Sequence, residues 1–214
     1  MSPDFSDERH RMVETQIRRR GLRDERLLAA FEAVPRHLFV PEEVRRAAYD
    51  DMPLSIGHGQ TISQPYIVAL MISLLQLQGD ERVLEVGTGS GYQAAILSHM
   101  TAQVETVELV PELGEVAERL LQALGYSNVH VHVGDGSLGW PISAPYPAII
   151  AAAAAPEVPK PLLEELSEGG RLVLPVEANH EQLLKVYTRQ HGAYPERIIT
   201  AVAFVPMKGR YGWA

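Results

Sequence analysis

Cysteine is absent from the 214 residues of this chain. Its absence excludes a disulfide scaffold, a thiolate zinc site, an iron–sulfur centre and a cysteine nucleophile. Positive charge is also scarce, because 27 acidic and 19 basic side chains leave a net charge of -8 with histidine neutral. A negative chain has no long-range attraction to phosphate backbones or anionic lipid. We therefore expect neither nucleic acid nor a membrane as partner.

Long apolar runs are missing as well. The longest, residues 67–75 and 148–155, fall short of the roughly 20 residues that cross a hydrocarbon core. Residues 1–10 are polar and include acidic Asp4, whereas a secretory signal needs a basic start and an apolar stretch. With 46% apolar residues, the chain is typical of a single cytoplasmic domain spanning residues 1–214.

Hydrophobic spacing divides this domain into three parts. Residues 1–64 carry two helical stripes, over 12–17 and 27–34, and then a long aperiodic loop that leads to the next helix. Residues 65–176 begin with a helix and then alternate between strands and helices. Residues 177–214 contain two strand-like segments, 183–188 and 198–205, that predict an antiparallel ribbon at the sheet edge. The alternating part predicts strands at 82–86, 104–108, 129–133, 148–152 and 171–176, and helices at 92–100, 113–124 and 160–166.

Short links between alternating strands and helices are typical of a parallel sheet covered on both faces. We therefore predict an α/β fold of the doubly wound kind. Its Rossmann-like sheet has seven strands, mostly parallel, with an antiparallel strand at the carboxyl terminus and helices at the amino terminus. Ligands bind such sheets at the carboxyl ends of the strands.

A glycine-rich turn follows the first predicted strand, with Gly87, Thr88, Gly89 and Gly91 leading into a helix. Such a turn lets a ligand approach the main chain while helix amides point toward it. A nucleotide-like cofactor is the expected occupant. The dinucleotide fingerprint fails when it starts at Gly87, but its looser form is met from Gly89 onward. Glycine spacing alone therefore leaves the cofactor class open.

Glu85 narrows the choice of cofactor. A carboxylate at the end of a central strand is costly to bury unless a cation or a hydrogen-bond donor meets it, and it would repel a pyrophosphate. S-adenosylmethionine carries an ammonium and a sulfonium and no phosphate. We therefore favour this cofactor, with a dinucleotide or a purely structural turn as the alternatives.

Two more acidic residues end the next two strands. Glu108 lies about 20 residues further on, where a carboxylate can accept ribose hydroxyls, although it could simply favour the amino end of a helix. Asp135, within Gly134-Asp135-Gly136, could accept the adenine amino group or belong to an ordinary turn.

Several motifs give the whole chain a resemblance to one family. It is similar to the bacterial type of protein-L-isoaspartate O-methyltransferases, which belong to the class I S-adenosylmethionine-dependent superfamily. The glycine turn identifies only the superfamily, whereas the stretch from Gly59 to Pro65, Gly-Gln-Thr-Ile-Ser-Gln-Pro, is specific. The other matches are 34–36, 39–41, 48–51, the rest of 56–66, 85–95, 134–136, 169–172 and 204–206.

The resemblance implies an enzyme that methylates the free α-carboxylate of L-isoaspartyl residues in damaged proteins and peptides, using S-adenosylmethionine and no metal. We also expect a monomer, although the sequence does not give the oligomeric state. In the family, Ser63 matches the active-site serine, and Ile56, Gly57, His58, Thr61 and Ile62 match the strip against the substrate. The matching cofactor positions are Glu85, Gly87, Thr88, Gly89, Gly91, Glu108, Leu109, Asp135 and Gly136.

The chemistry of the acceptor fits this activity. A peptide carboxyl has a pKa of about 3.3 to 4, so it is already ionised at neutral pH and needs no base before it attacks a sulfonium methyl. Ser63 could then hold the carboxylate by one hydrogen bond, or it could merely cap the helix that begins near Pro65. Catalysis would come from alignment and exclusion of water.

Other functions stay open on the same fold. The chain could methylate a small molecule or RNA, or it could hold the cofactor without catalysis. His130 and His132 lie on one face of a strand but lack a third metal ligand. The family also usually has an aspartate where this chain has Pro147 and a small or hydroxylated residue where it has Lys208.

Overall fold

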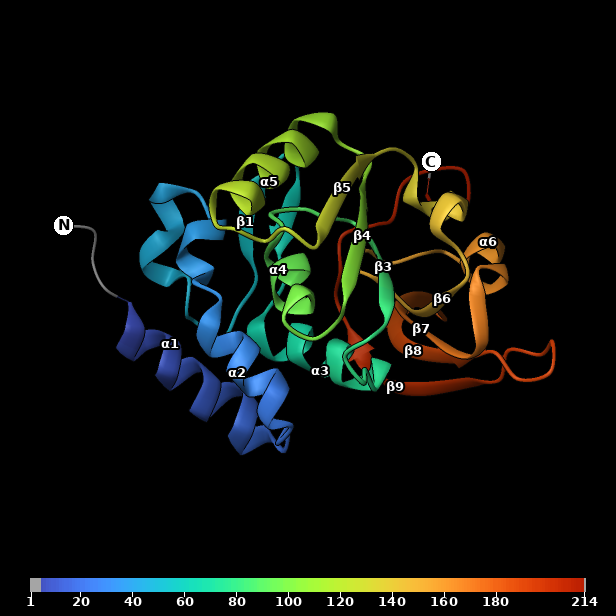
Figure 1. Cartoon of the computed structure of the whole chain (residues 1–214), viewed down its shortest axis with the longest axis horizontal. Coiled ribbons are helices and arrows are strands. Elements are labelled where there is room, and N and C mark those ends of the chain that lie inside the picture. The colour runs from blue at the N-terminus through green and yellow to red at the C-terminus, as the bar shows by residue number, and fades with distance from the viewer. Residues whose placement is uncertain (1–4, 214) are drawn as a thin grey trace.

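The computed structural model describes residues 5–213 (Figure 1). Residues 1–4 lie outside this range, and with them Asp4 of the acidic start. None of the helices in the described part combines the length and apolar character needed to cross a membrane.

A seven-stranded sheet forms the centre of the molecule, as predicted (Figure 1). Its strand order is β5-β4-β3-β6-β7-β8-β9. The first five strands in this order pair in parallel, whereas β8 runs antiparallel to β7 and β9 antiparallel to β8. The bounds are β3 Arg82–Val86, β4 Gln103–Glu108, β5 Val129–Val133, β6 Tyr146–Ala151, β7 Leu166–Ala178, β8 Glu181–Thr188 and β9 Glu196–Val202.

Helices cover both faces of the sheet. Alternate residues of β3 point to opposite sides, so that Val83 joins one apolar core and Leu84 the other. The first core also takes side chains from α3 and α4, and the second takes Leu162 of α6. Proline occupies the first turn of α3, α5 and α6, where its missing N–H costs nothing. The bounds are α3 Pro65–Leu75, α4 Tyr92–Ser98, α5 Pro111–Ala123 and α6 Lys160–Glu164.

Both helical stripes predicted for the amino-terminal part are helices. The first comprises α1 Ser6–Met12, the π-helical turn η1 Val13–Ile17 and the 3-10 turn η2 Arg18–Arg20. The second is α2 Glu25–Ala33, whose amino end is capped by Asp24, because its carboxylate accepts hydrogen bonds from two backbone amides. The apolar sides of both segments join the core shared with α3 and α4.

The aperiodic loop predicted over residues 35–64 is wrong, because this stretch contains four short elements. Two 3-10 helices, η3 Arg36–Phe39 and η4 Glu42–Ala47, precede a two-stranded antiparallel sheet of β1 Leu54–Gly57 and β2 Gln60–Ile62. Their connection places Gly57, His58 and Gly59 at φ values of 88°, 52° and 71°, which glycine adopts readily. Strands this short leave too little periodicity to be recognised.

Several boundaries in the second half also differ from the prediction, among them the ends of α6 and β9. The helix expected over 160–166 ends at Glu164, because Leu166 already pairs with Tyr146 and begins β7. The last strand ends at Val202 and not at 205. The residues beyond Val202 cross back over the sheet to Ala154, whose amide donates to the Val205 carbonyl over 2.8 Å.

Candidate functional site

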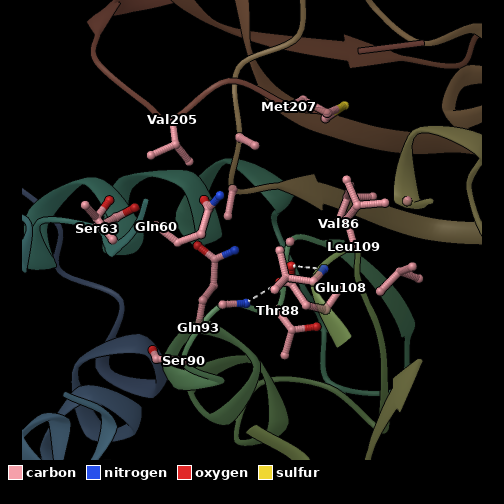
Figure 2. Close-up of a pocket in the computed structure, with 18 of the residues that line it drawn as sticks. Gln60, Ser63, Val86, Thr88, Ser90, Gln93, Glu108, Leu109, Val205 and Met207 are labelled. Atoms are coloured by element: carbon pink, nitrogen blue, oxygen red, sulfur yellow. Dashed lines mark hydrogen bonds between the residues drawn. The ribbon is translucent and has the colours of Figure 1, made fainter. Parts of the chain in front are cut away.

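A crevice lies at the carboxyl ends of β3, β4 and β6 (Figure 2). It holds about 890 Å³ of empty space, part of it open to solvent. Residues from distant parts of the chain line it. Most come from four stretches, 60–63, 86–93, 107–110 and 205–208.

The glycine turn forms one wall of this crevice. Gly87, Gly89 and Gly91 have φ values of 93°, 53° and 84°, so the turn depends on residues without a Cβ. Gly87, Thr88 and Gly89 line the crevice, but Gly91 does not. Gly91 instead begins α4, where an added Cβ would lie 3.2 Å from the Leu121 side chain. Gly91 therefore shapes the turn from the side that faces away from the crevice.

Glu85 lies behind this wall and is fully buried. Its Oε2 accepts a 2.5 Å hydrogen bond from the Thr106 hydroxyl, which lies 2.7 Å from the hydroxyl of the crevice-lining Thr88. Its Oε1 has no hydrogen-bond partner within the described part of the chain. Burial raises the pKa of Glu85 to about 8, against the opposing effect of the Thr106 and Gln93 side chains.

Glu108 ends β4 and does line the crevice. Its two carboxylate oxygens accept hydrogen bonds from the backbone amides of Gly89 and Val110, at 2.8 and 3.0 Å (Figure 2). Leu109 follows it in the wall, with 40% of its surface exposed. The carboxylate thus ties the glycine turn to the end of β4.

Asp135 is not among the lining residues, although Gly136 and Ser137 are. Its Oδ1 accepts from the backbone amide and hydroxyl of Ser137, and its Oδ2 accepts from the amide of Arg210 over 2.7 Å. Asp135 therefore anchors the carboxyl-terminal segment here. Gly136 is required by close packing, since an added Cβ would lie 2.7 Å from Val86 Cγ1.

Opposite the turn lies the strip from Gln60 to Ser63, called the acceptor strip below. All four of its residues line the crevice. Figure 2 shows Gln60 and Gln93 between Ser63 on one side and Glu108 on the other. Ser63 does not cap α3, because the cap position is Gln64 and no side chain accepts a hydrogen bond there.

The remaining residues predicted for the substrate strip do not line the crevice. Ile56, Gly57 and His58 belong to β1 and its turn. Ile56 lies against the glycine turn from outside, because a Cβ on Gly89 would be 3.5 Å from its Cδ1. His58 is exposed at the tip of the hairpin.

Sequence reasoning missed the contribution of the carboxyl-terminal segment. Val205, Pro206, Met207 and Lys208 line the crevice, held by bonds between the main chains of Ala154 and Val205 and of Met207 and Ala154, both 2.8 Å. The match of 204–206 to the family was the available signal. Also missed were Gln60, Val68, Val86, Ser90, Tyr92, Gln93, Val107, Val110, Ser137, Ala152 and Ala153.

The two histidines on β5 have another environment. His132 contacts Glu105 at 2.6 Å and stacks on Trp140 at 4.1 Å, whereas His130 is exposed. Among residues 5–213, no cluster of three histidine or acidic side chains is arranged to hold a metal ion.

The donor set of the crevice suits a cationic ligand with hydroxyl groups. Glu108 offers a carboxylate in the wall, and behind the glycine turn the buried Glu85 has an oxygen without a hydrogen-bond partner among residues 5–213. Lys208 is the one basic residue in the lining described by the structure. Such a site disfavours a pyrophosphate and fits the ammonium, sulfonium and ribose of S-adenosylmethionine.

The sequence is similar to known proteins over nearly its full length. A sequence model of the family described as protein-L-isoaspartate(D-aspartate) O-methyltransferase matches residues 7–212. A protein-L-isoaspartate O-methyltransferase of Methanoregula boonei is 53% identical, covering 97% of this chain and 96% of its own. One of Methanoculleus marisnigri is 50% identical, covering 96% and 94%.

Two solved structures share the architecture. A protein-L-isoaspartate O-methyltransferase superposes with a TM-score of 0.88 at 28% identity, over 95% of this chain and 67% of the other. A Plasmodium falciparum protein, described as an enzyme of the same kind and complexed with S-adenosyl-L-homocysteine, gives 0.83 at 25% identity. That match covers 94% of this chain and 98% of the other.

Proposed function

Because the chain belongs to the protein-L-isoaspartate(D-aspartate) O-methyltransferase family, we propose that it methylates the free α-carboxylate of L-isoaspartyl residues in damaged proteins and peptides. The arrangement of the crevice is the structural observation that supports this proposal. The crevice has the Glu108 carboxylate and the glycine turn on one side and the acceptor strip, with Ser63, on the other.

The residues of the glycine-turn side would hold S-adenosylmethionine. Glu108 would accept hydrogen bonds from the ribose hydroxyls of the cofactor. Glu85 would stabilise the positive charge of the cofactor, and the amides of the turn would contact its methionine part. When bound, this cofactor supplies a methyl group on a positively charged sulfur. Glu108 would exchange its present bond with the Gly89 amide for bonds to the ligand.

The acceptor side has no need of a general base. The pKa of a peptide carboxyl, about 3.3 to 4, leaves the acceptor oxygen ionised at neutral pH. Ser63 would donate a hydrogen bond to this carboxylate and hold it in line for attack. Residues 205–208 wall the crevice between the two sides, which excludes water from the developing bond.

Each of the three parts of the chain would have its own role in methyl transfer. We propose that residues 1–64 present the acceptor, residues 65–176 hold the cofactor, and residues 177–214 complete the wall between them. Support comes from the lining, which draws on residues 60–63 of the first part, residues 86–93 and 107–110 of the second and residues 205–208 of the third.

An acceptor competition tests this function. The protein is incubated with methyl-labelled S-adenosylmethionine, an L-isoaspartyl peptide, the matching L-aspartyl peptide and RNA. We expect the label only on the isoaspartyl peptide, as a base-labile ester. Label on RNA alone, or on no acceptor while S-adenosylhomocysteine still binds, would contradict the proposal.

A further inference from the structure

Arg36 is a fully buried charged side chain that the proposed function does not yet use. It lies in the stretch Val34-Pro35-Arg36, directly after α2, and begins η3. A fully buried arginine is uncommon unless it is paired. Its surroundings therefore call for an explanation.

The Arg36 guanidinium joins two separate segments of main chain. Its Nε donates to the Ala48 carbonyl over 2.7 Å, and its Nη2 donates to the Ser63 carbonyl over 2.8 Å. The group also lies 4.9 Å from the centre of the Tyr92 ring. Ser63 and Tyr92 both line the crevice, on the acceptor strip and after the glycine turn.

No carboxylate within residues 5–213 forms an ion pair with this charge, and the Arg36 Nη1 is buried without a hydrogen-bond partner there. Burial lowers the pKa of Arg36, but arginine stays protonated in proteins. A neutral donor would satisfy both carbonyls at a smaller desolvation cost. The hydrogen bonds alone thus do not account for a cation here.

The acceptor supplies a reason for the charge. An isoaspartyl α-carboxylate must come to rest near Ser63, in a crevice whose other side carries Glu108 and, behind the wall, Glu85. The Glu108 carboxylate opposes the entry of another carboxylate, and Glu85 adds to this repulsion when it is ionised. A cation directly beneath the Ser63 main chain offsets this repulsion, and the low dielectric of the interior strengthens its effect.

We propose that Arg36 is a positioning residue for methyl transfer, which fixes the main chain at Ser63 and makes the acceptor side of the crevice attractive to a carboxylate. The proposal rests on the function proposed above. It predicts that loss of Arg36 weakens the use of the acceptor and leaves the binding of the cofactor nearly unchanged.

Chemical rescue separates the charge from the hydrogen bonds. In Arg36→Ala, we expect kcat/KM for an isoaspartyl peptide to fall by roughly thirtyfold or more, mainly through KM, for the loss of a buried charge and two hydrogen bonds. The dissociation constant of S-adenosylhomocysteine should change by less than about threefold. Millimolar guanidinium should restore part of the activity, whereas urea, which is planar and of similar size but neutral, should not.

A matched pair covers the case in which Arg36→Ala does not fold. Arg36→Lys and Arg36→Met replace the side chain by groups of similar length, one charged and one neutral. We expect Arg36→Lys to keep a KM at least about fivefold lower than that of Arg36→Met. Equal KM values for this pair would overturn the proposal, as would equal rescue of Arg36→Ala by urea and guanidinium.

Arg26 provides the control. Its guanidinium also donates to main-chain carbonyls, those of Leu77, Gln78 and Met100, but it is exposed and does not line the crevice. Arg26→Ala should lower the melting temperature without changing KM for the peptide. Should the wild-type protein itself methylate no isoaspartyl peptide, the proposed function fails, a result distinct from any effect of Arg36.

Discussion

A serine hydroxyl can donate one hydrogen bond to a carboxylate, and Ser63 is the serine of the acceptor strip. We expect Ser63→Ala to lower kcat/KM for an isoaspartyl peptide by about 10- to 100-fold, since a hydrogen bond to a charged group contributes roughly 1.5–3 kcal/mol. The melting temperature should change little, because the hydroxyl does not cap α3. Steady-state kinetics and thermal unfolding measure both effects.

Ser73→Ala is the matched control for this variant. Its hydroxyl donates to the Leu70 carbonyl over 2.7 Å within α3 and does not line the crevice. The control should retain wild-type kinetics. Full activity of a folded Ser63→Ala protein would refute the role of Ser63 in holding the acceptor.

Glu85 makes the stability of the ligand-free protein depend on pH. Its pKa is about 8 in the folded state against 4.5 ordinarily, so the folded protein binds more protons between these values than the unfolded chain. The free energy of unfolding therefore falls as the pH rises from 4.5 to about 8. Glu85→Gln lacks this loss. The free energy of unfolding of the variant, relative to that of the wild type, should therefore rise with pH by on the order of a few kcal/mol.

Urea unfolding of both proteins at about pH 5 and pH 8 measures the effect of Glu85. Glu118→Gln, which changes an exposed carboxylate of α5, should follow the wild type at both pH values. A constant difference between Glu85→Gln and the wild type across this range would show that burial does not shift the pKa of Glu85.

At the scale of elements, the carboxyl-terminal segment depends on Asp135. The Asp135 Oδ2 accepts from the Arg210 amide, and the Ser137 hydroxyl, itself bonded to Asp135, accepts from the Tyr211 amide over 3.0 Å. We expect Asp135→Ala to speed amide hydrogen exchange over residues 205–213 in the absence of ligand, by roughly tenfold for each 1.4 kcal/mol lost.

Asp24→Ala is the control for Asp135→Ala, because Asp24 also bonds two backbone amides but caps α2. It should leave exchange over 205–213 unchanged. Exchange over residues 205–213 as slow in Asp135→Ala as in the wild type would contradict the anchoring role.

The elements also show how much of the fold can be predicted from the sequence. Strands such as 82–86 and helices such as α5 were predicted because their apolar residues repeat over several turns or alternate strand positions. The hairpin of β1 and β2 has strands of 4 and 3 residues, too short for a period to emerge. The glycine turn and Glu108 were placed by local patterns, whereas residues 205–208 reach the crevice through contacts with Ala154, about which the local sequence carries no information.

At the scale of the whole molecule, ligand binding should stabilise every part that meets at the crevice. At a concentration 100-fold above its dissociation constant, S-adenosylhomocysteine would add about 2.7 kcal/mol. For a chain of 214 residues, this corresponds to a rise in melting temperature of about 5–10 °C. NAD at the same concentration should produce no rise. A response to NAD and none to S-adenosylhomocysteine would contradict the assignment of the cofactor.

The route of the chain also has a consequence for synthesis. Residues 60–63 and 205–208 sit on either side of the glycine turn in sequence, yet share one crevice with it. A growing polypeptide interrupted shortly after β9 would possess every strand of the sheet and the whole turn, but not the wall formed by residues 205–208. Activity would thus begin only once residues 205–208 have left the ribosome. Proteolysis after Val202 would abolish activity while leaving every strand of the sheet in place.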